Sequence, residues 1–189
     1  METTITYFEK PGPHNSQKCR DLAMAAVNER GFKHLVVAST TGETGLLFAE
    51  AFKDKDINLV IVTHSYGFRE PNQLEMTPEM ADKIKSLGAK IYTGTMITHN
   101  LETSLAKKFS GVYPTTLVAL TLRKFGEGTK VCCEIVMMAS DGGLIPEQEE
   151  VIAVAGTGRG SDTVLITRSA VSKRYLDLKV LEILAKPRG

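Results

Sequence analysis

Residues 35–45, LVVASTTGETG, place hydroxyl side chains and glycines directly after four apolar residues. A helix that follows such a loop offers unpaired N–H groups and the positive end of its dipole, and hydroxyls add donors for phosphate oxygens. The segment is neither a Walker A loop, because no Gly-Lys-Ser/Thr follows, nor a GxGxxG fingerprint. In the alternative interpretation the hydroxyls only cap the helix. The candidate phosphate-binding residues are Ser39, Thr40, Thr41, Gly42, Glu43, Thr44 and Gly45.

A second glycine-rich segment, AGTGRGSDT, covers residues 155–163. Its third glycine comes one residue too early for a nucleotide fingerprint, and a strand rather than a helix is predicted to follow. A plain turn between two strands is therefore the simpler interpretation. Arg159, between Gly158 and Gly160, remains a candidate to clamp an anion through two parallel hydrogen bonds.

Two further loops carry polar and aromatic side chains. THSYGFREPNQ begins at Thr63 and contains His64, Tyr66 and Gly67, and TGTMITHN begins at residue 93 and contains Thr95 and His99. His64 and Tyr66 are candidates to stack on a planar ring or to hydrogen bond to it. In the alternative interpretation these residues only support the loops.

No catalytic constellation stands out in the sequence. It contains no nucleophile elbow, and nothing near Cys132 and Cys133 is expected to lower the pKa of either thiol. Glu134 and Asp141 are predicted to lie on opposite sides of an apolar helix, where a structural role as hydrogen-bond acceptors is favoured.

Composition restricts the class of protein. The 189 residues are 42% hydrophobic and 24% charged, with a net charge of +1, so there is no electrostatic case for binding nucleic acid or an anionic membrane. No apolar run reaches membrane-spanning length, and the first residues lack the pattern of a signal peptide. Three cysteines, two of them adjacent, fit neither a disulfide framework nor a zinc pattern. We therefore expect a reduced, cytoplasmic protein without a bound metal.

Strand and helix patterns alternate along the chain, which predicts a mainly parallel sheet covered by helices on both faces. Pro78, after the hydroxyl of Thr77, marks one helix start, and Gly31 marks one helix end. The strands are predicted over residues 3–8, 34–38, 58–63, 90–93, 150–155, 163–167 and 176–184, the last two as a possible hairpin. The helices are predicted over residues 15–30, 43–53, 78–88, 115–124 and 130–143.

This topology predicts where a ligand binds. In open sheets of this kind, ligands lie beyond the carboxyl ends of the strands. The segments 39–45, 63–68, 93–100 and 156–162 all follow strands, so we expect them to meet at one edge of the sheet.

Specific segments of the chain resemble a family of stand-alone proteins related to the C-terminal domain of pyruvate kinase. They include YFEKPG, VVASTTGETG, THSYGFREPNQLEM, MMASDGGLIP and EEVIAVAGTGRGSDT, and they span nearly the whole sequence. The resemblance implies a single α/β domain over residues 1–189, with three α/β/α layers. Its mixed five-stranded sheet has the order 3-2-1-4-5 and one antiparallel strand, with extra strands at the C-terminus.

The same resemblance implies a ligand. In pyruvate kinase this domain binds a regulatory sugar phosphate, and the family is associated with flavin mononucleotide (FMN). Here the phosphate is expected on residues 39–45 and the flavin ring against the loops of His64 and His99. The chain departs from the family pattern at Met96, where a histidine is expected. It also lacks the barrel that transfers phosphoryl groups, so kinase activity is not implied.

Three functions follow as hypotheses. The first is a binding protein for a phosphate-bearing small molecule, with FMN the leading candidate. The second is a flavin-dependent oxidoreductase, although no NAD fingerprint accompanies the flavin. The third is a regulatory module that binds a sugar phosphate and forms homo-oligomers through a sheet edge. Under the first hypothesis, a Cβ at Gly42 is expected to abolish anion binding, because it would keep the backbone from approaching the anion closely.

Overall fold

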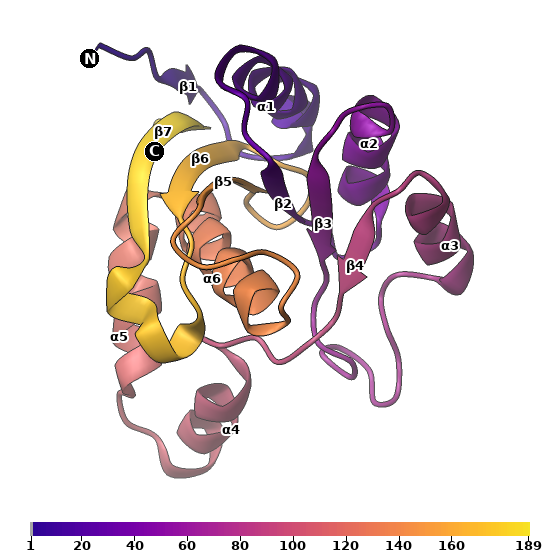
Figure 1. Cartoon of the computed structure of the whole chain (residues 1–189). Coiled ribbons are helices and arrows are strands. Elements are labelled where there is room, and N and C mark those ends of the chain that lie inside the picture. Colours follow the sequence, from indigo (N-terminus) through magenta and orange to yellow (C-terminus); the bar gives the residue numbers. More distant parts are fainter. Residues whose placement is uncertain (1) are drawn as a thin grey trace.

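A computed structural model describes residues 2–189, and one seven-stranded sheet runs through it (Figure 1). The strand order is β1-β7-β6-β5-β2-β3-β4. Only β6 runs antiparallel to its neighbours β5 and β7, and all other pairs are parallel. The strands are β1 (Thr6–Phe8), β2 (His34–Ala38), β3 (Asn58–Val62), β4 (Lys90–Tyr92), β5 (Glu150–Ala155), β6 (Thr163–Arg168) and β7 (Lys179–Pro187).

Five of these strands confirm the expected central order, and two correct the expected size of the sheet. When β2 is counted as the first strand of this series, the neighbours β4-β3-β2-β5-β6 have the expected order 3-2-1-4-5, and the last of them, β6, is antiparallel. The sheet nevertheless has seven strands rather than five. The chain turns back after β6 to form β7, and the N-terminal β1 then pairs with β7, with Thr6 opposite Ala185. Figure 1 shows the two ends of the chain on this side of the sheet.

Helices cover both faces of the sheet. On β2, Leu35 and Val37 pack under α1, α2 and α3, while Val36 between them points to the other face and packs under α6. This alternation follows from the two-residue period of a strand. The helices are α1 (Ser16–Arg30), α2 (Glu43–Phe52), α3 (Pro78–Ser86), α4 (Asn100–Phe109), α5 (Pro114–Leu122) and α6 (Glu127–Asp141), with 3₁₀ turns at Pro13–Asn15, Arg123–Phe125 and Ser172–Asp177.

Local signals placed most helix ends correctly. Gly31 ends α1 in the left-handed conformation, with φ of 71°, and the Thr77 hydroxyl accepts a hydrogen bond from the N–H of Met80 at the start of α3. The first part of the predicted strand 176–184 is instead a 3₁₀ turn, so β7 begins at Lys179.

Helix α4 was not predicted. Leu101, Leu105 and Phe109 recur at helical spacing, but the sequence analysis overlooked this pattern. None of the residues of α4 is buried, and Leu101 and Phe109 are 72% and 71% exposed. Figure 1 shows it at the end of the molecule, away from the sheet. Within residues 2–189, no helix combines the length and the apolar character needed to cross a bilayer.

Candidate functional site

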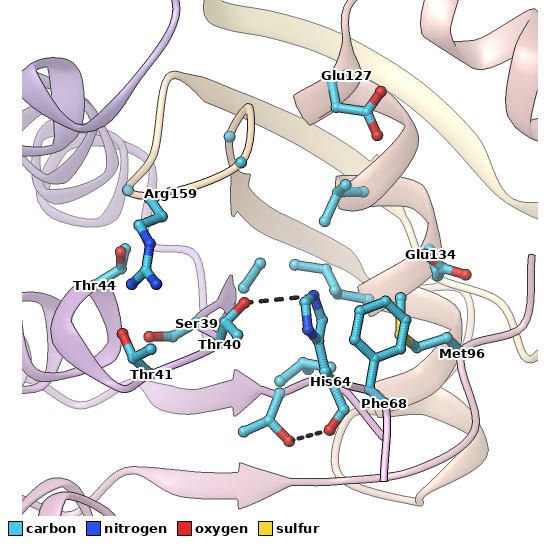
Figure 2. Close-up of a pocket in the computed structure, with 18 of the residues that line it drawn as sticks. Ser39, Thr40, Thr41, Thr44, His64, Phe68, Met96, Glu127, Glu134 and Arg159 are labelled. Atoms are coloured by element: carbon cyan, nitrogen blue, oxygen red, sulfur yellow. Dashed lines mark hydrogen bonds between the residues drawn. The ribbon is translucent and has the colours of Figure 1, made fainter. Parts of the chain in front are cut away.

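A cavity of about 310 Å³ opens at the carboxyl ends of β2, β3 and β5 (Figure 2). It lies at the edge of the sheet where the topology predicts a ligand. The loop after β2, the loop after β3, the β5–β6 loop and one side of α6 form its walls. Eleven of the sequence-predicted residues line it: Ser39, Thr40, Thr41, Glu43, Thr44, Thr63, His64, His99, Gly158, Arg159 and Gly160.

The loop between β2 and α2 forms one end of the cavity. Ser39 Oγ accepts a hydrogen bond of 2.9 Å from the N–H of Gly45, so this hydroxyl does cap the helix. The side chains of Thr40, Thr41 and Thr44 line the cavity. Within the described chain, no protein group accepts from the N–H groups of Glu43 and Thr44 in the first turn of α2. Hydroxyls, free N–H groups and a helix N-terminus therefore converge here, as an anion requires.

The two glycines of this loop have a different task from the one expected. Gly42 and Gly45 do not line the cavity. A Cβ on Gly42 would lie 2.2 Å from Cγ of Met80 on α3, and one on Gly45 would lie 2.8 Å from Cγ2 of Ile61 on β3. These glycines let α2 pack closely against its neighbours. A Cβ at Gly42 would therefore overlap Met80 inside the protein, and not a bound anion as the sequence analysis expected.

Gly42→Ala is therefore expected to lower the stability of the fold. Gly42 has φ of 99°, which an L-residue adopts only with strain, and the new methyl group also overlaps Met80. Overpacking adds about 1–3 kcal/mol to the strain. Gly31→Ala is the matched control, because Gly31 also has positive φ but no atom lies within 4 Å of the position that a Cβ would take there. Denaturant unfolding measures both losses, and a loss at Gly42 no larger than at Gly31 would contradict the packing role.

The β5–β6 loop brings Arg159 to the same end of the cavity. It is a turn between two strands, as the simpler interpretation predicted. Asp162 anchors it by accepting hydrogen bonds of 3.0 Å from the N–H groups of Thr157 and Gly12. Arg159 is exposed, and Figure 2 shows its guanidinium directed toward the side of the loop that carries Thr41 and Thr44, with no hydrogen bond to the other residues drawn. Its donors are thus available to an anion in the cavity.

His64 lies at the middle of the cavity within a chain of hydrogen bonds. Its Nε2 is 3.4 Å from the hydroxyl oxygen of Thr40 (Figure 2), and its Nδ1 is 2.6 Å from Oε2 of Glu75. The other oxygen of Glu75 pairs with Nε of Arg69 at 2.9 Å. A carboxylate beside Nδ1 favours a proton on that nitrogen, which leaves Nε2 facing the Thr40 hydroxyl. Sequence reasoning did not find Glu75, because no motif links it to His64.

Beyond His64, two rings and an apolar wall complete the cavity. The ring of Phe68 lies 4.2 Å from that of His64 and 5.1 Å from that of His99, between centroids. Burial lowers the pKa of His99, and the nearby charge of Lys130 lowers it further. The apolar lining residues are Ala38, Val62, Phe68, Met96, Val131, Ile135 and Met138.

Three predicted residues of the ring end lie outside the cavity. Tyr66 is 60% exposed, and its hydroxyl donates to the carbonyl of Asn72 in its own loop. Gly67 and Thr95 also do not line the cavity. Phe68, two residues after Tyr66, is the aromatic side chain that faces it.

Helix α6 forms a charged wall of the cavity, although the sequence analysis favoured only a structural role for Glu134. Lys130 Nζ lies 2.5 Å from Oε2 of Glu134, and the two side chains are 4% and 3% exposed. The N–H and the hydroxyl of Thr98 both donate to Oε1 of Glu134 at 2.7 Å. Burial alone would raise the pKa of the Glu134 carboxyl, but Lys130 and Thr98 outweigh it, and the pKa lies below its ordinary value. Glu134 is thus the buried acceptor that was expected, and it also lines the cavity.

The thiols take no part in this site. Cys19, Cys132 and Cys133 are buried and free. Burial raises the pKa of Cys19 and Cys133 to about 12 and that of Cys132 well above its ordinary value. They are therefore protonated and unreactive at neutral pH.

Comparison with known proteins defines the class of protein. The family described as the pyruvate kinase alpha/beta domain matches residues 17–167, so the chain belongs to this family. Among solved structures, a pyruvate kinase from Cryptosporidium parvum is similar at 17% identity and a TM-score of 0.42 over 80% of this chain. The same enzyme in complex with ADP matches at 18% identity and a TM-score of 0.42, also over 80% of this chain. The chain spans about a quarter of these enzymes, 23% and 24% of their lengths.

The comparison with solved structures also finds an enzyme of another kind at lower similarity. An O-ureido-L-serine synthase matches 69% of this chain and 49% of its own length, at 15% identity and a TM-score of 0.32.

Proposed function

We propose that the protein binds a small molecule that carries a phosphate group, and that FMN is the first candidate. The observation that carries the proposal is the convergence of three kinds of donor at one end of the cavity. These are the free N–H groups at the start of α2, the hydroxyls of Thr40, Thr41 and Thr44, and the guanidinium of Arg159. Charge-assisted hydrogen bonds from such groups are the strong ones in phosphate recognition.

The rest of the cavity suits a planar ring better than a second strongly charged group. Phe68 and His99 offer ring faces, and Met96, Ile135 and Met138 form an apolar surface. A volume of about 310 Å³ is within the usual range for ligand pockets, about 300–1,000 Å³. A molecule with a phosphate at one end and a flat ring at the other matches both halves. FMN has this design, whereas a sugar phosphate would use the phosphate end alone.

The test begins with the purified protein. Its visible absorption spectrum is recorded, the protein is denatured, and any released small molecule is identified by mass spectrometry. A yellow protein that releases FMN near one per chain supports the proposal, and reduction of that flavin by added reductants then tests the oxidoreductase alternative. A colourless protein that binds neither FMN nor inorganic phosphate in calorimetry overturns it. A colourless protein that binds inorganic phosphate but not FMN favours the sugar-phosphate alternative.

A further inference from the structure

We propose that His64 contacts the ligand's phosphate as an imidazolium, so that the site takes up one proton when it binds a phosphate dianion. The proposal rests on the proposed function, because it concerns the same phosphate. It assigns His64 to the anion end of the cavity, rather than to a flavin ring as the sequence indicated. It also makes the preferred ligand a phosphate monoester, whose dianion profits most from the added positive charge.

Nε2 of His64 lies next to the loop that is proposed to hold the phosphate. This atom lies 3.4 Å from the Thr40 hydroxyl, and Thr40 belongs to the loop that offers its donors to the phosphate. A phosphate oxygen that accepts from the Thr40 hydroxyl is therefore within reach of Nε2. Neutral His64, with its proton held on Nδ1 by Glu75, would present a lone pair to that oxygen. Two acceptors repel each other, so the contact requires a proton on Nε2.

The surrounding charges explain why the proton arrives with the ligand. From its own loop, Glu75 favours the imidazolium, but Arg69 on the other oxygen of Glu75 offsets part of that charge. The remaining charged or titratable groups lining the cavity are Glu43, His99, Arg123, Glu127, Lys130, Glu134 and Arg159. Arg123 and Lys130 are paired with Glu127 and Glu134. In the described chain this leaves two charges without an ion-pair partner beside the loop between β2 and α2, the carboxylate of Glu43 and the guanidinium of Arg159. A bound dianion adds an attraction that favours protonated His64.

The experiment is calorimetric titration of the full chain with FMN and with inorganic phosphate, in buffers of different ionisation enthalpy. The titrations are made at about pH 8, where an ordinary imidazole is mostly neutral and a phosphate monoester is a dianion. The dependence of the observed heat on the buffer gives the number of protons taken up. We expect the wild-type chain to take up about one proton for each phosphate bound. The His64→Gln variant should still bind phosphate, with lower affinity, and should take up about none. Riboflavin, which lacks the phosphate, should bind without proton uptake.

The variants separate this inference from the proposed function. His34→Gln is the control, because His34 lies at the start of β2, at the opposite end of that strand from the cavity loop, and should leave the uptake unchanged. Glu75→Gln removes the partner of Nδ1 and should reduce the uptake, which keeps the inference testable should His64→Gln fold poorly. Phosphate binding without proton uptake, or with the same uptake in His64→Gln, would overturn the role of His64 alone. Binding of neither FMN nor inorganic phosphate would overturn the proposed function, and this inference with it.

Discussion

Arg159→Gln is expected to weaken binding of FMN or inorganic phosphate by roughly ten- to a hundredfold. A hydrogen bond to a charged group contributes about 1.5–3 kcal/mol, which corresponds to that change in affinity. The guanidinium is exposed and directed toward the loop between β2 and α2, and no hydrogen bond ties it to the other residues drawn in Figure 2. Its loss should therefore affect the ligand and leave the fold intact. Calorimetry measures the affinity, and the melting temperature is expected to stay at the wild-type value.

The control for this variant is Arg20→Gln. Arg20 lies on α1, pairs with its neighbour Asp21 and does not line the cavity, so its removal makes the same change in net charge without touching the site. Equal affinities in the Arg159 and Arg20 variants would remove Arg159 from the phosphate site. A loss of riboflavin binding as large as the loss of FMN binding would mean that the variant damages the cavity rather than the phosphate contact.

Glu134→Gln is expected to destabilise the protein by about 3–5 kcal/mol, because it leaves the ammonium of Lys130 buried without a counter-charge. Denaturant unfolding measures this loss. The ion pair also predicts a pH dependence. Since the pKa of Glu134 lies below its ordinary value of 4.5 in the folded protein, its stabilising contribution is present above that value and is lost as the pH falls through the folded pKa. This part of the acid destabilisation should be missing in Glu134→Gln.

The matched variant replaces both partners, as Lys130→Met with Glu134→Leu. Replacing a buried ion pair by apolar side chains of similar volume is often neutral or stabilising, so the double variant should recover the loss caused by the unpaired Lys130. The recovery is reduced by the cost of leaving the N–H and the hydroxyl of Thr98 without their acceptor. Such recovery would show that the stability of the fold does not depend on the ion pair itself. A Glu134→Gln protein as stable as the wild type would contradict the buried ion pair.

The parts of the fold that depend on local signals could be predicted from the sequence. The turn from β2 into α2 is encoded by four apolar residues, a run of hydroxyls and Gly42, all adjacent in the chain. The pairing of β1 with β7 joins Thr6 to Ala185, and no local pattern reports a contact so distant in sequence. The expected extra strand at the C-terminus is present as β7, but the place of β1 beside it was not predicted for this reason.

In the candidate site, too, the parts that depend on local sequence were predicted and the parts that depend on distant contacts were not. The end proposed to bind phosphate was predicted from one contiguous segment, and the sheet topology predicted that Arg159 would lie at the same edge of the sheet, where it lines the cavity. Its other end depends on the path of the loop after β3, where Phe68 rather than Tyr66 lines the cavity. In the same loop, Glu75 pairs with both His64 and Arg69. The wall of α6 was missed because Lys130 and Glu134 lie one turn apart in an apolar helix, and the sequence pattern of such a helix indicates a buried core.

The most direct test of the phosphate site is a comparison of FMN and riboflavin, which differ only in the phosphate. Titrated side by side by calorimetry, FMN is predicted to bind at least about tenfold more tightly, since even one charge-assisted hydrogen bond to the phosphate is worth that factor. Equal affinities for the two would place the phosphate outside the loop of Thr40, Thr41 and Thr44 and would contradict the proposed site. Failure of both FMN and inorganic phosphate to bind would contradict it more completely.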